Sequence, residues 1–290
     1  TWWGLAPVTE SEQPLVSPGE PVRLSGSSLS GLTECPLRWF LNHEAKAKDA
    51  TSSAMGFGSV VHALAHEVAS GHSVADVDIL MGRLDRVWSS LAFDAAWQST
   101  QQYDEARAAV VRFLDWHAAA RDRTVAGAEV PFEVDVDVPG GTVRLRGSVD
   151  RLEVDSGGQV HVVDLKTGKS LPSGSALKRH VQLGTYQAAV RAGAFDDALA
   201  GHATAPAANG GPTLGGAELV MLRHDGEHGA KVCGQVGLTP ADPWMETVLE
   251  GAARRVLDEQ FPPTPDEQLC RRCPYRRCCP AQPEGRQVVP

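Results

Sequence analysis

Residues 146–168 of the chain read RGSVDRLEVDSGGQVHVVDLKTG. Two runs rich in Val and Leu flank a short Ser-Gly-Gly segment at 156–158, and this pattern predicts a β-hairpin. A three-residue loop with one glycine in the left-handed conformation closes hairpins of this length. With that loop, Val154 faces Val160 and Leu152 faces Val162.

The same register places two carboxylates opposite each other. Asp150 then faces Asp164, and Lys166, two residues further along its strand, lies on the same face of the sheet. Opposed carboxylates repel each other unless a cation lies between them, and oxygen-rich sites suit Mg²⁺ or Mn²⁺. A lysine beside them can orient a water or offset charge on a phosphate. The structural alternative is that Asp150 and Lys166 form a salt bridge while Asp164 caps a turn.

The motif Gly-x-x-Asp-Arg at 147–151, followed after the hairpin by Asp-x-Lys-Thr-Gly at 164–168, resembles the core of the PD-(D/E)XK nucleases, specifically their RecB-type branch. The resemblance implies that the two aspartates and Lys166 are catalytic residues of a metal-dependent nuclease. One position departs from the family pattern, because Val149 stands where the family has the Pro of its leading Pro-Asp. Only Asp150 of that pair is therefore carried over.

A helical motif before the hairpin extends the resemblance. Residues 58–62, Gly-Ser-Val-Val-His, look like the family's histidine motif, whose imidazole joins the metal site. The resemblance thus implies that His62 is a metal ligand. The other expected ligands are Asp150, Asp164 and the backbone carbonyl of Leu165, because a cation that binds carboxylates also accepts main-chain oxygen.

Gln182 and Tyr186 resemble the family's Gln-x-x-x-Tyr motif, on the helix that follows the sheet. Their spacing of four places them on one helix face, as two groups that reach the same phosphate require. Taken alone, these two would be ordinary surface residues and His62 a core histidine, but the ordered set of motifs favours a catalytic or binding role for all three. Glu129 and Glu133, on the strand before the hairpin, could support the ligands of the site, but they are interpreted as a solvated strand face.

The cysteines form a second candidate site. Four of the six lie between 270 and 279, which in a chain of this size favours metal binding over a disulfide framework. The spacing Cys270-x2-Cys273-x5-Cys279, with the lone Cys35, resembles the RecB-type nucleases of the AddB and AdnA/AdnB helicase–nucleases. There one N-terminal and three C-terminal cysteines hold a 4Fe–4S cluster. Zinc is the alternative occupant, since four thiolates also suit Zn²⁺. Cys278 and Cys233 are expected to lie outside the site.

Composition predicts a cytoplasmic globular protein. Hydrophobic residues are 42% and charged residues 22% of the chain. No apolar run approaches the roughly 20 residues that span a bilayer, and the start, Thr1-Trp2-Trp3-Gly4, does not resemble a signal peptide. The net charge of −9 does not favour a nucleic-acid partner. Buried metal-binding carboxylates contribute to that charge, however, and local basic patches can still bind phosphates.

The element order predicts one α/β domain with a mixed central sheet, flanked by helices and preceded by a helical region. The resemblance implies a restriction-endonuclease-like fold. Helices are expected at 25–45, 58–70, 176–192 and 243–259 and within 74–122, and strands at 129–138, 142–154, 160–165, 218–223 and 231–236. Residues 1–24 are expected to be a lead-in linker, 25–280 the nuclease domain closed by the cysteines, 194–216 a surface loop and 281–290 a tail.

The resemblance also implies a biological setting. The substrate is expected to be DNA, single-stranded above all, supplied by a helicase motor domain and a partner subunit during double-strand break end processing. Gly-Lys-Ser at 168–170 is no P-loop, because Val163 stands where its first glycine is required, so the chain is expected to be the nuclease module. Two alternatives stay open: a stand-alone nuclease of the CRISPR-associated adaptation type, and a non-catalytic DNA-binding module.

Overall fold

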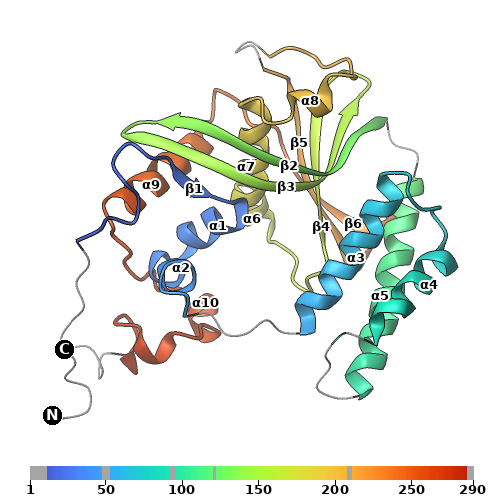
Figure 1. Cartoon of the computed structure of the whole chain (residues 1–290), viewed down its shortest axis with the longest axis horizontal. Coiled ribbons are helices and arrows are strands. Elements are labelled where there is room, and N and C mark those ends of the chain that lie inside the picture. The colour runs from blue at the N-terminus through green and yellow to red at the C-terminus, as the bar shows by residue number, and fades with distance from the viewer. Residues whose placement is uncertain are drawn as a thin grey trace.

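The computed structural model describes residues 12–47, 53–89, 91, 96–119, 122–207 and 211–285, with only the backbone of 53–57. Within these ranges a six-stranded mixed sheet carries helices on both faces (Figure 1). The mixed α/β fold predicted from the sequence is confirmed.

The sheet is organised around its third strand. The strands are β1 (Val22–Leu24), β2 (Arg123–Val138), β3 (Gly141–Asp155), β4 (Val160–Lys166), β5 (Leu214–Gly226) and β6 (Gly229–Gln235). β2 pairs antiparallel with β3 along its length, while β1 (parallel) and β4 (antiparallel) pair with different halves of β3. β4 and β5 are parallel, and β6 returns antiparallel to β5. The sheet is therefore mixed, with β4 at the junction between its antiparallel and parallel parts.

The predicted register of the β3–β4 hairpin is confirmed. Leu152 pairs with Val162 and Val154 with Val160. Gly158 has φ 76°, the left-handed conformation expected of the loop glycine. A Cβ at this position would also lie 2.6 Å from the Ala205 backbone nitrogen, so the residue is glycine for two independent reasons.

Helices cover both faces of the sheet. They are α1 (Gly26–Glu34), α2 (Pro36–His43), α3 (Ser53–Ala69), α4 (Val77–Trp88), α5 (Ala96–Ala118), α6 (Gly174–Lys178), α7 (Val181–Arg191), α8 (Asp196–Leu199), α9 (Trp244–Leu257) and α10 (Glu267–Arg271), with a 3-10 turn at Arg276–Cys278. One core joins α1, α7 and α9 to residues such as Leu145 and Leu152, and the other joins α3, α4 and α5 to Val163 and Leu165. None of the described helices has the length and apolarity needed to span a membrane.

Two predicted helices are each interrupted. The helix expected at 25–45 is split into α1 and α2 at Cys35, which is extended with φ −155°. The cause is Pro36, because a proline disfavours the helical conformation in the residue before it. The helix expected at 176–192 is likewise divided into α6 and α7, and His180 caps the second of these.

Two segments expected to be irregular contain packed structure. The lead-in 1–24 includes β1, whose Val22 and Leu24 are buried in the first core, although residues 1–11 are outside the described part. The expected surface loop 194–216 begins with the buried Phe195 (1% exposed) and forms α8. β1 has only three residues, too few for a distinctive sequence pattern, so the sequence did not predict it. The tail 281–290 is described only as far as residue 285.

Candidate active site

The candidate site lies where the two strands of the hairpin separate. The backbone ladder between β3 and β4 ends at the pair Arg151 and Val163. Beyond this pair, the Leu165 N–H donates its hydrogen bond to a side chain. The acceptor is Asp150 Oδ2, at 2.6 Å. The same register continued by one residue brings Asp150 to Asp164, so the opening between the strands is lined by both carboxylates.

Asp164 is the centre of a polar network with residues of β4 and α7. Lys166 Nζ lies 2.7 Å from its Oδ2, and Tyr186 OH donates to its Oδ1 at 3.2 Å. Gln182 uses both ends of its amide: Nε2 donates to Asp164 Oδ1 at 3.3 Å, while Oε1 accepts from Lys166 Nζ at 3.0 Å. Gly26 of α1 packs on Gln182 from the other side, where a Cβ would lie 3.1 Å from its Cγ. Gln182 and Tyr186 thus share the helix face that their spacing predicts.

The electrostatics of Asp164 fit a bound cation. The side chain is 6% exposed. Burial raises the pKa of this carboxyl, the Lys166 ammonium opposes the shift, and the negative charge of Asp150 adds to it. Oδ2 forms an ion pair with the Lys166 ammonium. A buried carboxylate of this kind is stabilised by a divalent cation, for which carboxylate oxygens are suitable donors.

Burial also raises the pKa of Tyr186, and the nearby charge of Asp164 adds to that shift. The phenol therefore remains protonated at neutral pH. It can act as a hydrogen-bond donor and not as a base.

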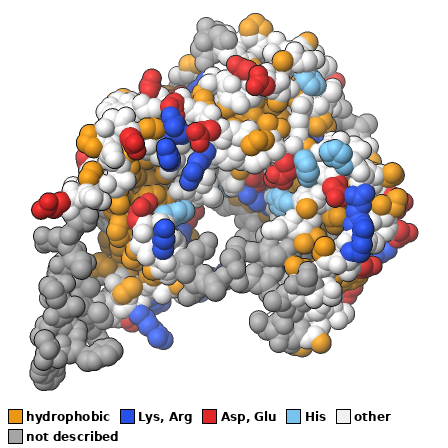
Figure 2. Space-filling model, viewed as in Figure 1, with side chains coloured by type: hydrophobic (Ala, Val, Ile, Leu, Met, Phe, Trp, Pro, Cys, Tyr) orange, Lys and Arg blue, Asp and Glu red, His pale blue; other side chains and the backbone are white. Residues whose placement is uncertain are grey.

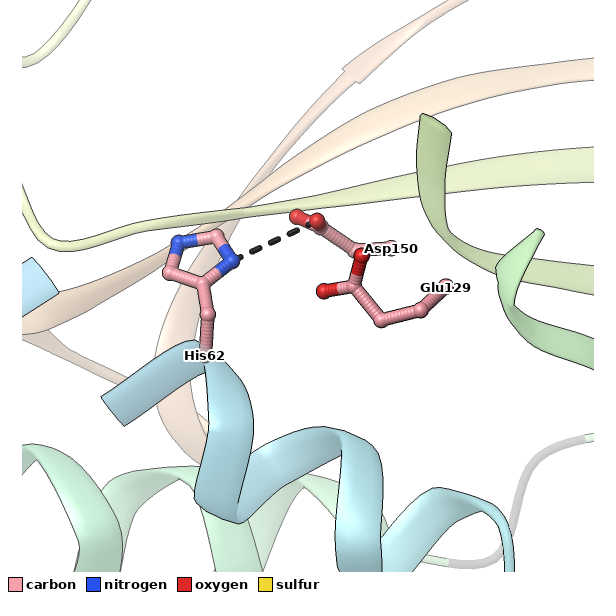
Figure 3. Close-up of side chains that lie close together, drawn as sticks. All are labelled: His62, Glu129 and Asp150. Atoms are coloured by element: carbon pink, nitrogen blue, oxygen red, sulfur yellow. Dashed lines mark ion pairs between the residues drawn. The ribbon is translucent and has the colours of Figure 1, made fainter. Parts of the chain in front are cut away.

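A second group of side chains lies on the α3 side of the opening. His62 Nδ1 is 3.3 Å from Asp150 Oδ1, and one ligand atom each of His62, Glu129 and Asp150 lies within 4.8 Å of the other two. Figure 3 shows the three side chains pointing toward one another from α3, β2 and β3. In the part of the chain that is described, this is the only such group of three or more His, Cys, Asp or Glu residues. The third member of this group is Glu129, whereas the sequence predicts Asp164 as the third side-chain ligand. Convergence of His62, Asp150 and Asp164 on one cation therefore stays a prediction.

The charge state of His62 reflects its acidic neighbours. Burial would lower the pKa of this imidazole, but the hydrogen bond to Asp150 and the charges of Asp150, Asp164 and Glu129 raise it overall. In its protonated form the imidazole offsets negative charge at a place where a metal cation can do the same.

Glu129 belongs to this group, although the sequence favoured a solvated strand face for it over a supporting role at the site. A solvated strand face is the right description for Glu133, whose side chain is 57% exposed and lies 3.8 Å from Arg144, and it is wrong for Glu129. The sequence does contain information that places Glu129. The tight turn at 139–140 pairs Val138 with Gly141 and so sets the register of β2 against β3. The same register, followed along both strands, places Glu129 opposite Asp150.

A glycine at the start of the histidine motif brings α3 close to the end of β4. A Cβ at Gly58 would lie 2.9 Å from Thr167 Oγ1, closer than real Cβ contacts allow. His62 follows one helical turn later, on the same face. The motif glycine therefore lets the helix approach the strand closely enough for the imidazole to reach Asp150.

Three of the four predicted cysteine ligands are neighbours in the structure. Burial raises the pKa of the Cys273 thiol, and Cys35 and Cys270 are close enough to add to that shift. All six cysteines are free. The C-terminal segment is held against α2 by hydrogen bonds from Leu37 N–H to the Pro262 carbonyl (3.3 Å) and from Tyr275 OH to Asn42 (2.6 Å). Among the described residues no three sulfur atoms lie within 4.8 Å of one another, so the cluster stays a prediction.

The site borders an opening in the molecule. In Figure 2 the surface is hollowed below the sheet, between the side formed by α1 and α2 and the side formed by α3. His62 extends from α3, and Gln182 and Tyr186 extend from α7, which packs against α1. The candidate residues therefore come from both sides of this hollow.

A comparison with protein families agrees with the motifs. A family model described as the PD-(D/E)XK nuclease superfamily matches residues 23–280, which include every predicted site residue and all four predicted cysteine ligands. Among solved structures, the chain is similar to one titled "Crystal structure of SSO0001", with 16% sequence identity and a TM-score of 0.40 over 91% of this chain and 88% of that one. No curated protein sequence matches the chain.

Proposed function

We propose that this chain, which belongs to the PD-(D/E)XK nuclease superfamily, is a divalent-metal-dependent deoxyribonuclease. The observation that carries the proposal is the arrangement around Asp164: a buried carboxylate, an ammonium at 2.7 Å and two further side chains that hold both in place. A salt bridge that only stabilised the fold would not require the second carboxylate, Asp150, beside it.

The residues of the site fit a divalent cation. In this proposal His62, Asp150, Asp164 and the Leu165 carbonyl would hold Mg²⁺ or Mn²⁺, ions that accept carboxylate and main-chain oxygen. When bound, the cation would act as a Lewis acid on a phosphodiester and on the water that attacks it. Asp150 would contribute through Oδ1, since its Oδ2 already accepts from the Leu165 N–H.

Lys166 and α7 would orient the reacting groups. The Lys166 ammonium lies between Asp164 Oδ2 and Gln182 Oε1, so its position is defined from two sides. There it would orient a water or stabilise negative charge that develops on the phosphate. Gln182 would act as a positioning residue, because it contacts Lys166, Asp164 and Tyr186 together.

We also propose that the chain is the nuclease module of an ATP-dependent helicase–nuclease that processes DNA double-strand breaks, with a motor domain and a partner subunit. The cysteines support this setting. Cys35, Cys270, Cys273 and Cys279 would hold a 4Fe–4S cluster, and Cys273 already has Cys35 and Cys270 as neighbours. The cluster would tether the N-terminal helices to the C-terminal segment and take no part in hydrolysis.

The substrate is tested with a labelled single-stranded DNA and an RNA of the same sequence. With Mn²⁺ or Mg²⁺ the protein is expected to cleave the DNA, and excess EDTA is expected to stop cleavage, because the carboxylates need the cation. Products are resolved on denaturing gels over a time course. RNA cleaved as fast as DNA would overturn the assignment to DNA. Binding of DNA without cleavage in either metal would favour the non-catalytic alternative.

A further inference from the structure

We infer that Glu129 is a further ligand of the cation that His62 and Asp150 hold, in addition to the ligands from β4 proposed above, so that β2 also contributes a carboxylate to the site. The inference rests on the proposed function for the presence of a metal at this site. It adds a residue that none of the sequence motifs contains.

The distances fit one cation. The ligand atoms of His62, Glu129 and Asp150 lie within 4.8 Å of one another. Ligand atoms that each lie roughly 2.0–2.6 Å from one ion are separated by no more than about twice that distance. An ion can therefore contact all three with small rotations of the side chains drawn in Figure 3.

The pairing of β2 and β3 places two negative charges side by side. Ala128 pairs with Arg151 and Val130 with Val149, so Glu129 lies directly opposite Asp150. Like charges opposite each other destabilise a sheet. A divalent cation between them turns the repulsion into two attractive contacts.

The strand holds the Glu129 carboxylate at this position. Ser148, two residues before Asp150 on β3, donates from its hydroxyl to Glu129 Oε2 at 3.3 Å. Glu129 also has φ 49°, a conformation that L side chains rarely adopt. Of the described non-glycine residues with positive φ, Glu129 is the one that lies inside a strand.

Asp164 lies on the other side of Asp150 from Glu129, so the two carboxylates approach the proposed cation from different directions. Its Oδ1 accepts hydrogen bonds from Gln182 and Tyr186, and its Oδ2 contacts Lys166. These contacts orient its carboxylate toward α7, whereas the group of Figure 3 lies on the α3 side of Asp150. Asp150 is thus the residue shared by the two groups.

The test measures Mn²⁺ binding to the full chain without DNA, by electron paramagnetic resonance of free Mn²⁺ and by calorimetry. Glu129→Gln keeps the size of the side chain but removes the charge. It is expected to weaken Mn²⁺ binding at least about tenfold, the lower end of what even supporting residues of metal sites contribute. The matched control is Glu133→Gln on the same strand, which is expected to bind Mn²⁺ as the wild type does. Equal Mn²⁺ affinity of the two variants would overturn the inference.

A second variant separates direct ligation from general electrostatics. Glu129→Asp keeps the charge but withdraws the carboxylate by one methylene group. It is expected to weaken Mn²⁺ binding as well, and wild-type affinity in this variant would overturn ligation by Glu129. Melting temperatures measured in EDTA establish that the variants fold. The melting temperature of Glu129→Gln is expected to equal or exceed that of the wild type, because the substitution removes one of two like charges.

The outcomes also separate this inference from the proposed function. Glu129-dependent Mn²⁺ binding in a protein that cuts no DNA supports the metal ligand and overturns the nuclease. If the wild type cleaves DNA but Glu129→Gln binds Mn²⁺ as the wild type does, the nuclease is supported and ligation by Glu129 is overturned.

Discussion

Replacing Asp164 by Asn is expected to slow DNA cleavage by about 10³-fold or more. The substitution keeps the shape of the side chain, so Tyr186 OH still finds an acceptor. It removes the charge that holds the Lys166 ammonium at 2.7 Å and that would bind the cation. Loss of a single preorganised group commonly costs 10²–10³ in rate, and here two functions are lost together. Single-turnover cleavage of labelled DNA measures the effect.

Lysine substitutions provide the matched comparison. Lys166→Met is expected to lower the rate as strongly as Asp164→Asn. Lys169→Met should change it little, because this lysine is 71% exposed and its ammonium lies 3.5 Å from Glu105. Burial raises the pKa of Asp164, so its buried charge opposes folding in a way that a neutral Asn does not, and the Asn variant should fold as well as the wild type. Wild-type cleavage by Asp164→Asn would remove this residue from the active site.

Replacing Cys35 by Ser is expected to abolish iron binding. Cys35 is the one proposed ligand in the N-terminal helices, and it lies at the break between α1 and α2, next to Cys273. Protein purified without oxygen should be brown and hold about four iron atoms, whereas Cys35→Ser should be colourless. Its melting temperature should also fall, because the tether between two distant parts of the chain is lost. Iron analysis and thermal unfolding measure both effects.

The control for this experiment is Cys233→Ser. Cys233 lies on β6 and packs against the first core, so its substitution should leave the iron content unchanged. A colourless wild type with one zinc per chain would contradict the cluster and keep the four-thiolate site. Wild-type protein with neither metal would contradict both.

The parts of the site that could be predicted are those that depend on local spacing. Loop length alone determines which residues of β3 and β4 face each other, and this placed Leu152 opposite Val162. Helical periodicity similarly placed Gln182 and Tyr186 on one face of α7, where both now contact Asp164. In each case the relevant residues are close in sequence or joined by one short turn.

The remaining features depend on contacts between distant segments. β1 is recognisable only because Val22 and Leu24 pair with β3, more than a hundred residues away. The small and polar neighbours of Phe195 predict a loop, yet its ring packs in a tilted arrangement against that of Phe132 in the core. Glu129 is an intermediate case, because its place beside Asp150 follows from a turn that the sequence does contain.

The most direct test of the central claim, that a divalent cation acts at Asp150, is an anomalous diffraction map from crystals of the chain soaked in Mn²⁺. A strong peak is expected within about 2.0–2.6 Å of an Asp150 carboxylate oxygen, with His62 and Glu129 as neighbours on the α3 side. Mn²⁺ peaks elsewhere on the molecule, with none at Asp150 in crystals of active protein, would contradict the account.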